Sequence, residues 1–281
     1  GTITINNASI ENHFYKLQLN PDKGTIQSLY DKELNCELVD SSSPWELGAF
    51  IYEKLGNRDQ LAQYRLDDYN RTGLSECRII DSSNGPIYQR ILLQGKSPGT
   101  DEAFGVNLEI KLYHDTKRIE LEYAIKRLPE TDPSGIYVAF PFQLPEGKLA
   151  FDVQGGTVIS GKNQLEGTST DWNTVQNFVS VQNNQAQIII GSSLIPLYQL
   201  GDINLGKFQY QKQYERPHVY SWVMNNYWNT NFKASQEGEF RWSYHLTSFS
   251  VCLSVCLSVS FFLSVSVFVP LSPSLPVSLC L

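Results

Sequence analysis

The residues best suited to bind a ligand lie in one short segment near the end of the chain. Residues 225–232, NNYWNTNF, combine four asparagines with three aromatic side chains. An asparagine amide offers a donor beside an acceptor, which matches the neighbouring hydroxyls of a sugar, and aromatic rings stack on the apolar faces of sugar rings. The segment therefore predicts a carbohydrate contact. A structural corner, with asparagines bonded to turn backbone and aromatics in the core, is the competing interpretation.

Catalytic chemistry is much harder to find. The histidines lie far apart, and the chain before residue 249 has no His-x-x-x-His or Cys-x-x-Cys spacing for a metal. It has neither a Gly-x-Ser-x-Gly elbow nor a phosphate-binding loop. Adjacent acids such as Asp67 and Asp68 lie in polar, loop-like stretches, and a carboxylate pair that hydrolyses glycosides is defined only by its separation in space. We predict no catalytic residue and no metal ligand in this chain.

Charge and composition narrow the class of protein. The formal net charge is -7 and no stripe of Lys or Arg appears, so we expect no nucleic-acid partner, because an acidic surface repels phosphate backbones. The chain has 15 tyrosines and 14 phenylalanines but one methionine, and such usage is typical of strands.

Period-two alternation dominates residues 1–248. Apolar and polar residues alternate in 106–112 and again in 119–126, which predicts a hairpin with one buried face. Similar pairs flank the turns at 20–24, 83–86 and 182–185. No ten-residue stretch shows a convincing helical stripe, and residues 56–70 are the weak exception. We predict an all-β domain of many antiparallel strands in large stacked sheets.

The last residues differ in kind. Residues 249–281 carry no charge and begin with a Ser-Val-Cys-Leu repeat, which a TCTG tetranucleotide repeat encodes in any reading frame. We interpret them as a low-complexity, disordered tail of translated simple-sequence DNA. A membrane anchor over 249–271 is the alternative because of its length, but frequent serines and absent basic flanks oppose it, and we expect no membrane partner.

Several ordered segments resemble the C-terminal β domain of glycoside hydrolase family 38, the α-mannosidases, and its bacterial-type members most. The similar segments occur in the family's order and cover roughly residues 8–248; they are 11–40, 44–53, 164–182, 192–206, 222–232 and 238–248. The resemblance implies a large antiparallel β supersandwich, similar to galactose mutarotase, over residues 1–248. In the family, zinc and the catalytic carboxylates lie in an N-terminal barrel, whose motifs are absent here.

The resemblance therefore implies a fragment of a carbohydrate-cleaving enzyme, and a chain that begins with Gly rather than Met agrees with that expectation. The expected partners are α-mannosides and the missing barrel, and the chain alone is expected to need no cofactor and to be inactive. Family context places a candidate cleft rim at Asn225, Asn226, Tyr227, Trp228, Asn229, Thr230 and Asn231. A second candidate is Phe50, which stands where eukaryotic relatives have a substrate-contacting tyrosine; it lacks the hydroxyl, and Tyr52 lies two residues further on.

Two other classes of function stay open. A free-standing carbohydrate-binding β-sandwich would need an exposed aromatic platform. An aldose epimerase-like enzyme would need a His/Glu acid–base pair across an open cleft, and the sequence shows no obvious partner for any of its four histidines.

Overall fold

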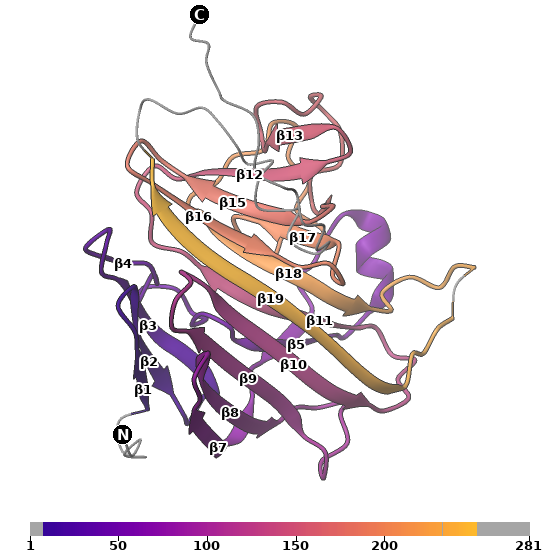
Figure 1. Ribbon diagram of the computed structural model, residues 1–281. Coiled ribbons are helices and arrows are strands. Elements are labelled where there is room, and N and C mark those ends of the chain that lie inside the picture. The colour runs from indigo at the N-terminus through magenta and orange to yellow at the C-terminus, as the bar shows by residue number, and fades with distance from the viewer. Residues whose placement is uncertain (1–7, 232, 252–281) are drawn as a thin grey trace, which may run out of the picture. The chain divides into compact units, whose positions relative to one another are not determined.

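A computed structural model describes residues 8–231 and 233–251, and it confirms the antiparallel all-β prediction (Figure 1). The N-terminal sheet has four strands in sequence order: β1 (Ser9–Glu11), β2 (Tyr15–Asn20), β3 (Thr25–Asp31) and β4 (Cys36–Glu37). A six-stranded sheet has the order β14 (Asn173–Thr174), β17 (Leu197–Leu200), β18 (His218–Asn225), β11 (Ser134–Pro141), β5 (Phe50–Leu55) and β6 (Tyr69–Thr72).

The largest sheet has nine strands. Its order is β13 (Gly156–Ile159), β12 (Lys148–Val153), β15 (Phe178–Gln182), β16 (Ala186–Gly191), β19 (Gly238–Ser250), β10 (Ile119–Arg127), β9 (Val106–Tyr113), β8 (Tyr88–Lys96) and β7 (Ser75–Asn84). The long strand β19 runs between β16 and β10 (Figure 1). The predicted hairpins β2–β3, β7–β8, β9–β10 and β15–β16 are all present.

The hydrophobic pattern explains how these sheets pack. In β9 the burial alternates strictly, because one face meets the core and the other meets solvent. One contiguous core joins residues of all three sheets, including Leu17, Leu108 and Phe140. By contrast, every residue of β11 is buried, so the six-stranded sheet is covered on both faces.

A second hydrophobic core lies on the other face of the six-stranded sheet. It contains Ile51, Tyr137 and Trp222 from the strands, and Leu61 from the 3-10 helix η1 (Arg58–Gln63). This helix occupies part of the weakly helical stretch and starts at Asn57, whose side chain accepts the backbone N–H of Asp59. Loops and η1 therefore form an outer layer over this sheet.

Strand β19 continues past residue 248, where we expected the domain to end. Phe249 and Ser250 pair with β16, and the Val251 N–H donates to the Gln185 carbonyl at 2.8 Å. Residues 252–281 lie outside the described residues, so the interpretation of the tail stays a prediction. Within 8–231 and 233–251, no helix is long and apolar enough to cross a membrane.

Candidate functional site

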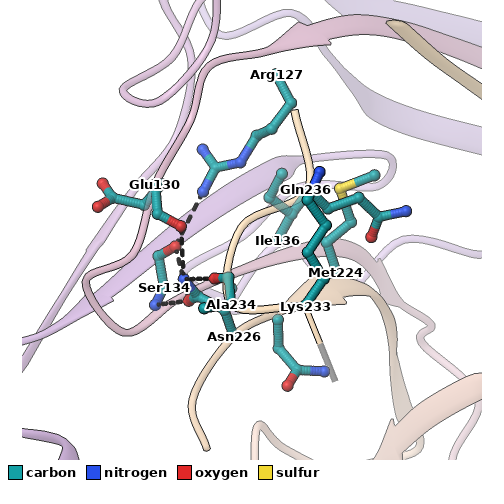
Figure 2. A pocket seen from close by; sticks show the side chains of 11 residues that line it. Arg127, Glu130, Ser134, Ile136, Met224, Asn226, Lys233, Ala234 and Gln236 are labelled. Atoms are coloured by element: carbon teal, nitrogen blue, oxygen red, sulfur yellow. Dashed lines mark hydrogen bonds between the residues drawn. The ribbon is translucent and has the colours of Figure 1, made fainter. Parts of the chain in front are cut away.

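The NNYWNTNF stretch of the sequence (225–232), which we call the Asn-rich segment, borders a cavity of about 360 Å³ through Asn225 and Asn226 (Figure 2). The ends of β10 and β18 and the start of β11 form its walls, together with the chain after the segment. The lining residues are Arg127, Glu130, Ser134, Gly135, Ile136, Met224, Asn225, Asn226, Lys233, Ala234 and Gln236. Two of the predicted site residues, Asn225 and Asn226, are therefore part of one concave site.

Asn226 ties the segment to the cavity wall. Its Oδ1 accepts the backbone N–H of Ser134 at 2.7 Å, and its Nδ2 donates to the carbonyls of Glu130 at 2.9 Å and Ala234 at 3.2 Å (Figure 2). These bonds occupy both donor positions of the amide and its acceptor. Asn226 is thus a structural residue in this chain.

Arg127 closes the opposite wall. Its guanidinium donates to the Gly99 carbonyl and to Ser134 Oγ, both at 2.9 Å, and lies 5.4 Å from the centre of the Tyr52 ring. The side chain is buried. Its charge is therefore held by neutral acceptors and an aromatic face, so the wall it forms is rigid.

Tyr227 anchors the segment in the second core. Its side chain is 0% exposed, and its hydroxyl donates to Glu53 Oε1 at 2.5 Å and lies 3.3 Å from the Tyr137 hydroxyl. Burial raises the pKa of Tyr227 well above its ordinary value, so the hydroxyl stays a donor. Glu53 is also fully buried and pairs with Arg71 at 2.5 Å.

Neither Glu53 nor Arg71 is marked as a site residue by the sequence pattern. In a strand of alternating polarity, a charged residue is expected to face solvent. Glu53 is buried because a second layer covers this face of the sheet. The signal that was present is the uninterrupted apolar character of the neighbouring strand β11, which predicts a strand covered on both faces.

Gly135 makes room for this anchor. A Cβ atom at Gly135 would lie 2.1 Å from the Tyr227 hydroxyl, which is far inside van der Waals contact. Only glycine therefore lets Tyr227 reach Glu53 across β11.

Arg58 fixes the backbone of the segment from outside. Its guanidinium donates to the Tyr227 carbonyl at 2.9 Å, to the Asn226 carbonyl at 3.2 Å and to the Thr131 carbonyl at 2.8 Å. Arg58 of helix η1 thus bonds the start of the segment. The helix is the coiled ribbon near the end of β18 in Figure 1.

The other predicted site residues divide by exposure. Trp228 packs against Trp172 and Trp222, with ring centres 5.6 and 6.1 Å away. Asn229, Thr230 and Asn231 are exposed, and Asn225 is half-buried at the cavity; Phe232 lies outside the described residues.

Phe50, the second predicted site, is 1% exposed in the main core, and Tyr52 is 4% exposed beside it. The accessible candidates for a ligand contact are therefore Asn225 and the tip formed by Asn229, Thr230 and Asn231. Contact with substrate stays a prediction for the whole set.

The structure does bring a histidine and a glutamate together, on the outer face of the nine-stranded sheet. Glu120 and His245 are register partners on β10 and β19, with Nδ1 3.6 Å from Oε2. Glu120 also accepts from the Tyr113 hydroxyl and from Arg118, both at 3.0 Å.

This pair is poorly suited to acid–base catalysis. Burial disfavours the Glu120 carboxylate, but Lys111 and Tyr113 outweigh it and lower its pKa. Burial and Arg118 lower the pKa of His245. A weakly basic carboxylate beside an imidazole that has already lost its proton at neutral pH is poorly suited to the base and acid steps of an epimerase. We assign the pair to sheet stabilisation.

Acidification is expected to destabilise the chain through the buried His218 and the half-buried His245. Burial lowers the pKa of His218 despite its bond to Asp40, and burial lowers that of His245. Below the ordinary value of 6.5, the unfolded chain takes up these protons more readily than the folded chain, so stability is present above this pH and is lost as the pH falls. The thermal midpoint, measured between neutral and mildly acidic pH, should fall, and a double H218N/H245Q variant should show a flatter dependence. An equally steep fall in that variant would contradict this assignment.

Among residues 8–231 and 233–251, no three His, Cys, Asp or Glu side chains come together to hold a metal ion. The two cysteines in this range, Cys36 and Cys77, are free, and burial raises the pKa of Cys77 to about 11. The described residues therefore do not fit the zinc site that the resemblance implies for the parent enzyme.

Comparison with solved structures gives the class of fold. The galactose mutarotase related enzyme from Lactobacillus acidophilus aligns with a TM-score of 0.50 at 13% identity, over 89% of this chain and 100% of that one. The fold is therefore of the galactose mutarotase-like class. An α-mannosidase from Enterococcus faecalis V583 aligns with a TM-score of 0.62 at 13% identity, over 88% of this chain.

The family follows from the sequence match. The family model described as "Glycosyl hydrolases family 38 C-terminal domain" matches residues 10–209, and the chain belongs to this family. A protein of glycosyl hydrolase family 38 from Enterococcus faecalis also aligns, with a TM-score of 0.61 at 12% identity over 88% of this chain. The chain spans 30% of the length of each of the two Enterococcus proteins. Among curated proteins, none matches this sequence.

Proposed function

We propose that this chain is the non-catalytic β domain of a family 38 α-mannosidase that hydrolyses α-mannosides. The family match over residues 10–209 carries the proposal. In it, zinc and the catalytic carboxylates belong to an N-terminal barrel outside this chain, and the β domain supports that barrel.

The exposed tip of the Asn-rich segment completes the rim of the substrate cleft. Asn229, Thr230 and Asn231 are exposed, and their side chains can bond sugar hydroxyls. The tip stands on a fixed base, because Asn226, Tyr227 and Arg58 bond the preceding residues to three different segments. A rigid base lowers the entropy that a contact loses on binding.

The chain alone is expected to release no sugar from an aryl α-mannoside, with or without added zinc, because the described residues assemble no metal group. Release of the aryl chromophore is the measurement. Turnover that a chelator abolishes would contradict the assignment of the chemistry to a separate barrel. Sequencing the transcript upstream of the Gly1 codon tests the same proposal, since a barrel-coding region is expected there.

A free-standing carbohydrate-binding module is the second candidate, and exposed aromatics favour it. Tyr64 is 73% exposed, Tyr210 65% and Phe208 48%. The loops that carry them adjoin, because a Cβ at Gly206 would lie 2.7 Å from the Arg65 carbonyl carbon. We call Tyr64, Phe208 and Tyr210 the aromatic platform. Sugar affinity that is lost in Y210A would support this function.

A further inference from the structure

The cavity beside the Asn-rich segment has a combination of groups that does not belong to the exposed tip at 229–231. In the described part of the chain, the side-chain amides of Asn225 and Gln236 form no hydrogen bond with another residue, although both line the cavity. Met224, which is half-buried, supplies apolar surface on the β18 wall, and the buried Ile136 lines the β11 wall (Figure 2). Free amides above an apolar floor match a sugar ring, which has hydroxyls at its edge and C–H groups on its face.

The charged groups that line the cavity already have partners. Arg127 is bonded to Gly99 and Ser134, and Lys233 pairs with Glu237 at 3.0 Å. Both cations are therefore already engaged. Glu130 presents a carboxylate, which accepts the Asp132 N–H at 3.0 Å and lies 3.6 Å from Lys54; it can accept a sugar hydroxyl.

The size of the cavity limits the ligand. Its volume of about 360 Å³ is at the small end of the range for ligand pockets, about 300–1,000 Å³. Its walls are held by the Asn226 and Arg127 bonds, so it is formed before any ligand arrives.

We propose that this cavity binds one neutral hexopyranose ring, with Asn225 and Gln236 on its hydroxyls and Met224 against its face. The choice of an α-mannoside as that ring rests on the proposed function. The residues that line the cavity do not include those of the exposed tip at 229–231.

The test is a titration of the 281-residue chain with methyl α-D-mannopyranoside, followed by the side-chain amide signals of Asn225 and Gln236 in NMR spectra. Saturable shifts with a Kd on the order of 1 mM are expected for a site with so few contacts. N225A and Q236A should each weaken binding by roughly 2- to 12-fold, the equivalent of one hydrogen bond. Q213A is the matched control, because Gln213 is exposed and lies outside the cavity, and it should bind like the parent. Glucose 6-phosphate should bind more weakly than the neutral glycoside.

Three results would overturn the proposal. The first is the absence of saturable shifts up to roughly 0.1 M glycoside, which is a hundredfold above the expected Kd. The second is unchanged affinity in both N225A and Q236A. The third is loss of binding in Y210A while the two cavity variants still bind. The last result places the sugar on the aromatic platform. The thermal midpoint of each variant shows that it is folded. If the cavity binds no sugar while the transcript encodes an active mannosidase, this inference fails and the proposed function stands. If the cavity binds sugar while the transcript encodes no barrel, the proposed function fails and the sugar site in the cavity stands.

Discussion

Replacing Arg71 with methionine is expected to lower the free energy of unfolding by about 3–5 kcal/mol, the usual effect of removing one partner from a buried ion pair. Arg71 Nε lies 2.5 Å from Glu53 Oε2, with side-chain exposures of 13% and 0%. The remaining donors to Glu53, the hydroxyls of Tyr137 and Tyr227, are neutral. Without Arg71, the carboxylate would be left in the second core with no counter-charge.

Urea unfolding followed by tryptophan fluorescence measures this loss, since Trp222 lies in the same core. The double variant E53Q/R71M is the control, because its neutral amide still accepts from Tyr227 and needs no counter-charge. It should recover most of the stability that R71M loses. A loss below about 1 kcal/mol in R71M, the range of a surface pair, would show that Arg71 does not neutralise Glu53. R71M should also loosen the Asn-rich segment, which Glu53 holds through Tyr227.

The second large effect is expected at Lys117, where the N-terminal sheet meets the rest of the domain. Asp31 at the end of β3 is 0% exposed; its Oδ2 forms an ion pair with Lys117 Nζ at 2.8 Å and accepts a hydrogen bond from Ser248 Oγ at 2.5 Å. K117M leaves this carboxylate uncompensated, and we expect a loss of about 3–5 kcal/mol in the free energy of unfolding.

A matched lysine shows whether burial is the cause. Lys23 pairs with Glu46 at 2.8 Å, but its side chain is 63% exposed, so K23M should cost less than about 1 kcal/mol. Denaturant midpoints of the two variants give the comparison, and limited proteolysis should cut K117M first within residues 8–37. Equal losses in K117M and K23M would rule out the buried carboxylate as the origin.

The hairpins of this domain could be predicted because their signals are local. In 106–112 and 119–126, alternation assigns each residue to a face, and turn residues set the pairing. The Asn-rich segment is different, since its composition suits both a ligand loop and a corner. The structure shows the corner, which Asn226, Tyr227 and Trp228 hold. Asn229, Thr230 and Asn231 face solvent, and their contact with a ligand stays a prediction.

The sequence by itself determined the all-β class, four of the hairpins and, through ordered similar segments, the family. These depend on neighbouring residues and on patterns that repeat along the chain. Tertiary structure alone decided that Glu53 is buried, that Phe50 lies in the core, and that Asn225 and Gln236 share one cavity. Each of those outcomes depends on contacts between residues far apart in the chain, such as Glu53 with Tyr227. Whether a polar side chain becomes an anchor or a ligand contact is set by what covers it, and period-two alternation carries no information about a second layer.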